Sequence, residues 1–143
     1  MIKLSDFDAR IINGIDKSIQ KYLGQHGNFS ALGIYSCPWS GWVSICFNRT
    51  KSISDVEENC PDFEDVEYGM IEIEEWANEY NSDKSIIEYQ NKTHQLEIEE
   101  IGDDGYNVYF FKYLIDIVNA KYGVKYKNKI LIQMLDSEYF KII

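Results

Sequence analysis

The stretch from Tyr22 to Asn48 contains no formally charged side chain, and no other part of the chain constrains the fold as strongly. A segment of this length could cross a bilayer as a helix. However, Pro38 lies near its middle together with several Gly and Ser residues, and lipid tolerates such turn-forming sequence poorly. We therefore expect no membrane segment and predict that this stretch is buried within protein.

The sequence YSCPWSGWVSICFN (residues 35–48) predicts a β-hairpin inside this stretch. With Trp39 and Ser40 at the tip, the strand register forms one nearly apolar face from three cross-strand pairs: Leu32 with Phe47, Ile34 with Ile45, and Ser36 with Val43. The other face is uncharged as well, so both faces need cover by protein. We therefore place the hairpin at the centre of its sheet, with a tight turn between Cys37 and Trp42.

Helical periodicity flanks the hairpin. Apolar spacing predicts one helix over residues 4–23, capped by Ser5 and ended by Gly24. A wide apolar stripe predicts another helix over 105–122, ended by Gly123. Between them, a capping signature at residues 54–57 predicts one or two helical turns.

The sequence predicts one further strand clearly, and it leaves two other segments open between helix and strand. Residues 129–135 are typical of a buried strand, which residues 138–143 continue after a break. Residues 66–74 fit a strand by their alternation but also fit a helix, and residues 82–101 leave helix and strand open. A chain of 143 residues suits one domain. We predict an α+β fold in a single domain, residues 1–143, with a mostly antiparallel sheet and a central hairpin packed against amphipathic helices.

The residues typical of catalysis and cofactor binding are scarce. Cys37, Cys46 and Cys60 form an odd set without a CxxC pair, which argues against a disulfide framework and a zinc ribbon. His26 and His94 lack metal-ligand spacing, and no phosphate-binding loop or GxSxG motif is present. We predict buried, unreactive cysteines, no metal and no cofactor. Because the N-terminal residues also lack a secretory signal pattern, we expect a cytoplasmic protein.

Acidic residues are concentrated in the middle of the chain. Residues 55–104 contain 18 acidic and 2 basic side chains, a net charge of −16, whereas the rest of the chain carries +6. Such a segment repels nucleic acid and attracts a basic protein. A solvated surface kept for solubility is the plainer alternative. The candidate partner-binding residues are the carboxylates of this segment: Glu57, Glu58, Asp62, Glu64, Asp65, Glu72, Glu74, Glu75 and Glu79.

Two aromatic residues join these candidates. Trp76 lies within the acidic segment and Trp39 lies at the predicted hairpin tip. A tryptophan in an acidic surround can anchor an interface when a partner buries it. The alternative for Trp76 is packing in the core, and for Trp39 it is folding back onto the sheet.

Three quoted motifs suggest a family. CPWSGWVSICFN, then CPDFEDVEYGMIEIEEW, then LDSEYF resemble small acidic immunity proteins that bacteria encode beside polymorphic toxins, including those of contact-dependent growth inhibition. The resemblance implies a cytoplasmic protein that binds and neutralises one cognate toxin domain, often a nuclease. The acidic segment predicts that this domain has a basic surface, and we predict that the chain is not an enzyme. The alternative is a small hydrolase or nucleotide-handling enzyme that uses carboxylates. A deep pocket with two converging carboxylates would favour the enzyme, and a convex acidic surface would favour the inhibitor.

Overall fold

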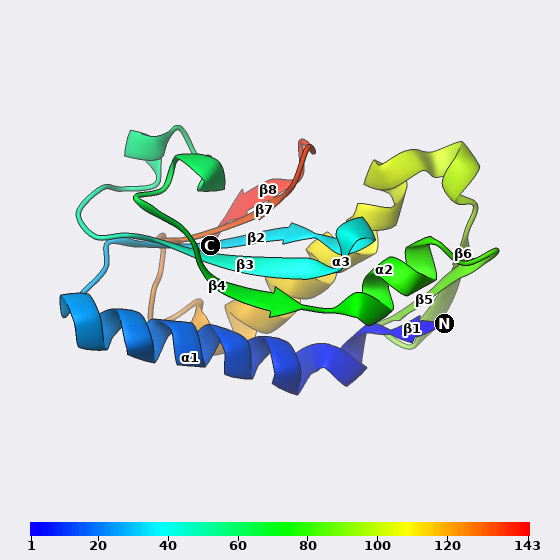
Figure 1. Ribbon diagram of the computed structural model, residues 1–143, viewed down its shortest axis with the longest axis horizontal. Helices are drawn as coiled ribbons and strands as arrows, with labels where there is room; N and C mark the ends of the chain where they lie inside the picture. Colours follow the sequence, from blue (N-terminus) through cyan, green and yellow to red (C-terminus); the bar gives the residue numbers. More distant parts are fainter.

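The computed structural model describes the whole chain, residues 1–143 (Figure 1). Its helices are α1 (Asp8–His26), α2 (Glu74–Tyr80) and α3 (Ile98–Tyr122). Its strands are β1 (Ile2–Lys3), β2 (Ala31–Cys37), β3 (Trp42–Asn48), β4 (Asp65–Glu72), β5 (Ser85–Tyr89), β6 (Lys92–Leu96), β7 (Ile130–Met134) and β8 (Phe140–Ile142). Short 3-10 helices occur at η1 (Leu4–Phe7), η2 (Pro38–Ser40), η3 (Ser54–Val56) and η4 (Cys60–Asp62).

The strands form two sheets. The larger sheet has the order β4-β3-β2-β7-β8, and the smaller has the order β1-β5-β6. β2 pairs in parallel with β7 and β1 with β5, whereas every other pair is antiparallel. The predicted α+β class is confirmed, and most of the pairing is antiparallel. The smaller sheet is an addition to the prediction.

The hairpin has the predicted register. Leu32 pairs with Phe47, Ile34 with Ile45 and Ser36 with Val43, and both strands are interior to the larger sheet. Its tip is the single turn η2, closed by Gly41 in the left-handed conformation with φ 74°. The uncharged sequence is therefore the centre of the fold, because burial on both faces leaves no place for a charge.

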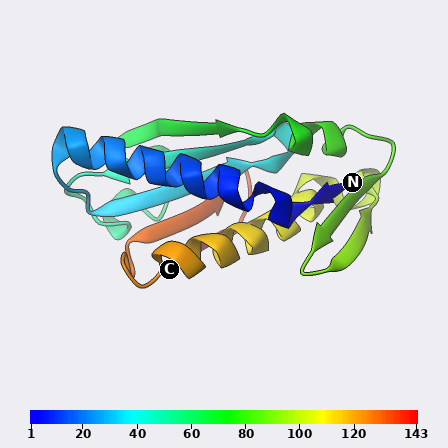
Figure 2. The same cartoon turned by 90° about the horizontal axis from the view of Figure 1, so that it is seen from below.

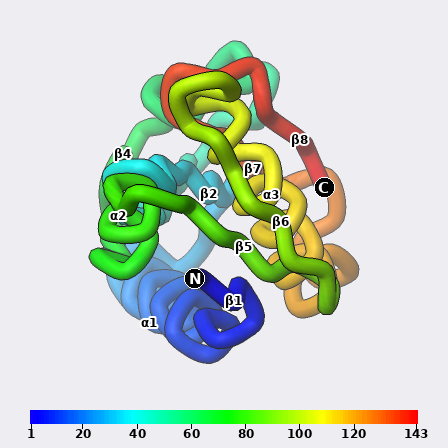
Figure 3. Tube along the Cα trace, turned by 90° about the vertical axis from the view of Figure 1, so that its right-hand side faces the viewer, coloured from blue at the N-terminus to red at the C-terminus, as the bar shows by residue number.

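Two helices cover one face of the larger sheet. Helices α1 and α3 lie side by side beneath it (Figure 2). One core of 27 buried residues joins them to the sheet and includes side chains of the smaller sheet. The smaller sheet and α2 lie at the end that holds the N-terminus (Figure 3). The opposite face, which we call the open face, carries only η3 and η4 over one end (Figure 1).

The ends of the first helix differ from the prediction. Ser5 lies in η1 and makes no capping hydrogen bond, and α1 begins only at Asp8. The helix continues through Gly24 and ends at Gly27, which has φ 77° and donates its N–H to the Leu23 carbonyl at 2.8 Å. Gly27 is the better terminator because it takes the left-handed conformation that a helix C-cap requires.

The two ambiguous segments each contain both kinds of structure. Residues 66–74 are a strand up to Glu72, and helix α2 starts at Glu74, so each alternative holds for one part. Residues 82–101 contain the hairpin β5–β6 and the first turn of α3. Helix α3 has a break at Gly102, with φ 66° and ψ −170°, and then runs over the predicted 105–122. No helix is both long enough and apolar enough to cross a membrane.

Candidate functional site

The predicted acidic residues fall into two groups at opposite ends of the larger sheet. Residues 57–65 belong to the segment with η3 and η4, and residues 72–79 belong to the junction of β4 and α2 (Figure 1). The hairpin tip lies beside the second group. The acidic candidates therefore do not form a single contiguous patch.

Several of these carboxylates already have partners within the chain. Glu64 accepts the backbone N–H groups of Thr50 and Lys51 at 3.2 Å, and these hydrogen bonds lower its pKa. Asp65 accepts the Tyr22 hydroxyl at 2.6 Å and lies 3.7 Å from Arg49. These two carboxylates stabilise the loop between β3 and β4.

Three other candidate carboxylates are also engaged. Asp62 accepts the Asn59 side-chain amide at 3.0 Å. Glu75 accepts the Arg10 guanidinium at 2.5 Å, which lowers the pKa of Glu75. Glu79 is only 9% exposed and accepts both the N-terminal ammonium and the Ile86 N–H. The expected role of Glu79 in partner binding is therefore wrong, because its buried carboxylate joins α2 to β1 and β5.

For Trp76 the alternative of core packing is correct, and the candidate role in partner binding is wrong. Its side chain is 0% exposed and packs edge-on against Phe7 and Phe110, with ring centroids 5.7 and 4.7 Å away. A partner cannot reach it, so it belongs to the core. Trp39 is half-buried and lies against the core, with its ring centroid 6.3 Å from that of Tyr80. It has folded back from the hairpin tip.

Four candidate carboxylates remain exposed and have no hydrogen-bond or ion-pair partner on their side chains. They are Glu57 and Glu58 in one group, and Glu72 and Glu74 in the other. Glu57 and Glu58 line one hollow, and Glu72 and Glu74 line another. These four carboxylates thus lie at two concave places on the surface.

The first hollow lies between the hairpin tip, the end of β4 and the start of α2. We call it the edge hollow; it encloses about 320 Å³ and is lined by Ser40, Gly41, Trp42, Met70, Glu72, Glu74 and Ala77. Its walls are held by the backbone, because the Gly41 carbonyl accepts the Ile73 N–H at 2.7 Å. The side chain of Met70 is 44% exposed here. Glu74 also lies in the first turn of α2, where a negative charge favours the helix.

The second hollow lies against the opposite edge strand of the same sheet. We call it the far hollow; it encloses about 660 Å³ and is lined by Glu57, Glu58, Asn59, Gln133, Ser137, Glu138 and Phe140. Gln133 fixes its floor, because its amide donates to Asn59 at 2.9 Å and accepts the Cys60 N–H at 2.7 Å. Phe140 is 48% exposed. Each hollow therefore combines free carboxylates with an exposed apolar side chain.

One cross-strand row connects the two hollows. In the registers of the larger sheet the row runs over the five strands as Met70, Ser44, Tyr35, Gln133 and Phe140. Paired residues share a face, so both hollows belong to the open face. Four strand spacings separate Met70 from Phe140 by roughly 19 Å. Strand pairing brings further residues to the hollows from distant segments, which charge and aromatic spacing along the sequence did not predict: Trp42, Met70, Gln133, Glu138 and Phe140.

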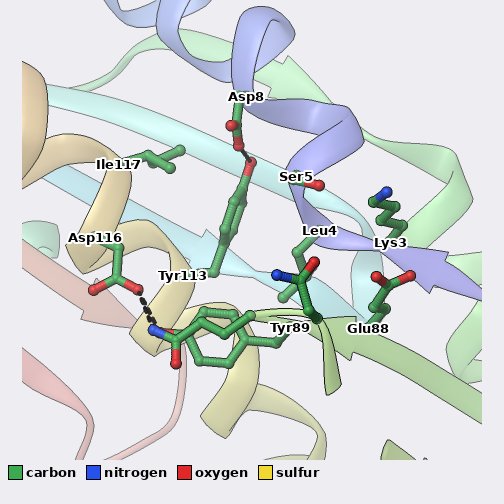
Figure 4. Close-up of a pocket in the computed structure, with 11 residues that line it drawn as sticks. Lys3, Leu4, Ser5, Asp8, Glu88, Tyr89, Tyr113, Asp116 and Ile117 are labelled. Carbon is green, nitrogen blue, oxygen red and sulfur yellow. Dashed lines mark hydrogen bonds between the residues drawn. The ribbon is translucent and has the colours of Figure 1, made fainter. Parts of the chain in front are cut away.

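A third hollow is relevant to the enzyme alternative, because several carboxylates surround it. It encloses about 270 Å³ between η1, α3 and the end of β5, with the carboxylates of Asp8, Glu88 and Asp116 around it (Figure 4). Asp8 accepts the Tyr113 hydroxyl at 2.7 Å, and Asp116 accepts the Tyr89 hydroxyl. Burial and these carboxylates raise the pKa of both tyrosines, which keeps them protonated as donors. The two aspartates are thus engaged in structural hydrogen bonds.

The three cysteines are free and buried. Burial raises the pKa of the Cys37 and Cys60 thiols, which disfavours the nucleophilic thiolate. Cys46 lies beside Cys60 on the open face, beneath η4. A hydrogen bond with Cys60 lowers the pKa of the Cys46 thiol, so burial alone limits the reactivity of Cys46. That all three cysteines are structural stays a prediction.

We expect the thiols to react slowly with a disulfide reagent such as dithionitrobenzoate. Because reagent must wait for an opening of the fold, the native protein should react at least about 100-fold slower than the same chain in guanidinium chloride. The measurement is absorbance of the released thiolate over time. A native thiol reacting at the unfolded rate would show that one cysteine is accessible.

No group of three or more His, Cys, Asp or Glu side chains is arranged to hold a metal ion. Comparisons with family models, with curated proteins and with solved structures give no match for this chain.

Proposed function

We propose that this chain is an immunity protein that binds and neutralises a cognate bacterial toxin domain. The observation that supports this most is the open face, where two hollows combine unpaired carboxylates with exposed apolar side chains. An interface needs such apolar anchors at its centre and charge around them. A standard interface buries roughly 800 Å² on each partner, which is enough to cover both hollows.

The partner is a protein with a basic surface, and nucleic acid is not a ligand. A toxin domain that cleaves nucleic acid needs basic residues to hold phosphates. Carboxylates of the open face would then occupy the place of phosphates and block access to the substrate. Complementary charge also speeds the encounter, by about 10-fold to 1000-fold when the fields are strong. The inhibitor would act in the cytoplasm.

The enzyme alternative has weaker support. Two of the carboxylates around the hollow in Figure 4 accept tyrosine hydroxyls, so they are not free to serve as an acid and base pair. The free carboxylates of the edge and far hollows lie beside exposed apolar side chains, an arrangement that suits a protein interface. We therefore prefer the inhibitor.

Growth protection tests the proposal directly. The proposal predicts that a toxin domain is encoded beside this gene, and that domain is expressed from an inducible promoter, with and without this chain. We expect growth only when the chain is present, and the two proteins should co-elute in gel filtration. If toxin-expressing cells die in its presence and the purified proteins do not bind, the proposed function is wrong.

Association with that toxin domain should depend on salt and on the free carboxylates. Raising the salt from about 0.05 to 0.5 M shortens the Debye length from roughly 14 to 4 Å, so association should slow by about 10-fold or more. Stopped-flow fluorescence measures the rate. Reversal to Lys at four sites should slow association at low salt: Glu57, Glu58, Glu72 and Glu74.

A matched variant separates position from net charge. It reverses four exposed carboxylates that lie away from both hollows: Asp83, Glu99, Glu100 and Asp104. Both variants change the net charge by the same amount, so a steering effect specific to the open face requires the first to be slower. If the two variants associate with the toxin domain at equal rates, the open face has no specific steering effect, and the acidic segment serves solubility instead.

A further inference from the structure

We infer that the edge hollow binds an arginine side chain of the partner, an inference that rests on the proposed function for the identity of the partner. The hollow lies where the sheet ends in an edge strand, and its lining combines the apolar side chains of Trp42, Met70 and Ala77 with the carboxylates of Glu72 and Glu74. Its occupant must therefore carry both an apolar stem and a positive charge.

The carboxylates are placed to pair with that charge. Glu72 on β4 is the direct cross-strand neighbour of Trp42 on β3, so the two side chains share one face of the sheet and line the same hollow. Glu74 lines the same hollow one residue beyond the end of the strand. Neither side chain pairs with a cation of this chain. Arg10 binds the Glu72 backbone carbonyl at 2.7 Å and the Glu75 side chain, so its guanidinium is already engaged.

The apolar walls favour arginine over lysine. A guanidinium is flat, stacks on an indole and can donate two hydrogen bonds to one carboxylate, whereas a lysine ammonium is compact and strongly hydrated. Trp42 is half-buried and held by Tyr35, with ring centroids 5.6 Å apart. The exposed Met70 side chain offers an apolar contact for the methylene stem.

The hollow is also formed before any partner binds. Gly41 brings the hairpin tip against the backbone of Ile73, and the 2.7 Å hydrogen bond between them fixes the distance from Trp42 to the start of α2. A site whose walls are already in place loses less conformational entropy on binding. This distinguishes the edge hollow from the far hollow, whose Glu57 and Glu58 lie in a loop.

The test uses N-acetyl-arginine amide as the probe and needs no toxin. NMR spectra of the labelled protein are recorded during titration, following the Trp42 indole N–H and the Met70 methyl group. We expect shifts that saturate with a dissociation constant on the order of 1–10 mM. N-acetyl-citrulline amide, which is neutral and nearly isosteric, should produce none. N-acetyl-lysine amide should bind at least about 3-fold more weakly.

Variants localise the effect. The pair Glu72→Gln and Glu74→Gln should weaken arginine binding by about 5-fold or more, whereas the matched pair Glu57→Gln and Glu58→Gln should leave it unchanged. Circular dichroism checks that both remain folded. Shifts absent from Trp42 and Met70, equal binding of citrulline or lysine, or equal loss in both pairs would each overturn the inference.

The two proposals can fail separately. If arginine amide saturates the edge hollow but no toxin domain binds, the proposed function fails and the site remains. If the chain protects cells while arginine amide does not bind, the edge hollow is not the anchor and the proposed function remains.

Discussion

Replacing Trp76 with alanine is expected to lower the free energy of unfolding by about 3–5 kcal/mol, a large part of the 5–15 kcal/mol typical of a domain. Trp76 is the largest fully buried side chain of the molecule. It joins three elements, because its ring contacts Phe7 of η1 and Phe110 of α3, and its carbonyl accepts the Tyr106 hydroxyl at 2.6 Å. Its removal leaves a cavity that these neighbours cannot fill.

Urea unfolding followed by far-ultraviolet circular dichroism measures this loss. Trp76→Phe should cost less, because phenylalanine fills much of the space and removes an indole N–H that has no hydrogen-bond partner. Trp39→Ala should also cost less, because Trp39 is only half-buried. If Trp76→Ala kept its full stability and lost only affinity for the partner, Trp76 would be an interface residue after all.

The hairpin was predictable because its signal is local. Alternation on both sides of one turn fixes the register, and a slip by one residue would expose Leu32, Ile34 and Ile45. The position at the centre of the sheet followed from the missing charge. The register and the central position of the hairpin could both be inferred without information about strand pairing outside the hairpin.

The ends of the helices and the hairpin β5–β6 were harder to predict from the sequence, because several residues could end each helix or form the turn. Gly24 is a plausible stop, yet the helix continues to Gly27. The hairpin β5–β6 turns at Gln90 and Asn91, with φ 52° and 62°, the conformation of a type I′ turn. Asn-Gly is the usual signal for that turn, and its absence hid the hairpin among polar residues.

The candidate site could be predicted only in part from the distribution of charge along the sequence. The number of acidic residues located the acidic segment, but it did not distinguish a free carboxylate from one that has a partner elsewhere in the chain. Glu79 binds the N-terminus and Glu75 binds Arg10, both more than 60 residues away. The apolar parts of the hollows, Met70 and Phe140, come from opposite edges of one sheet. Only the strand order reveals that they share a face.

Replacing Gly41 with alanine is expected to destabilise the fold by about 3 kcal/mol and to abolish arginine binding at the edge hollow. Gly41 has φ 74°, where a side chain costs roughly 1–2 kcal/mol. A methyl group there would also lie 2.5 Å from the Ile73 carbonyl oxygen. Because that oxygen belongs to the backbone, relief of the clash must move the hairpin tip away from α2 and open the hollow.

Gly27→Ala is the matched control for Gly41→Ala. Gly27 has nearly the same φ, 77°, but a methyl group there would meet nothing within 4 Å. The Gly27→Ala variant should therefore lose about 1 kcal/mol of its free energy of unfolding, which is the cost of the left-handed conformation alone. It should bind arginine amide as the unchanged protein does. Urea unfolding and the NMR titration of both variants separate the strain of a left-handed residue from the close approach at the hairpin tip. Equal stability losses, with binding intact in both, would mean that the contact between Gly41 and Ile73 does not hold the hollow in shape.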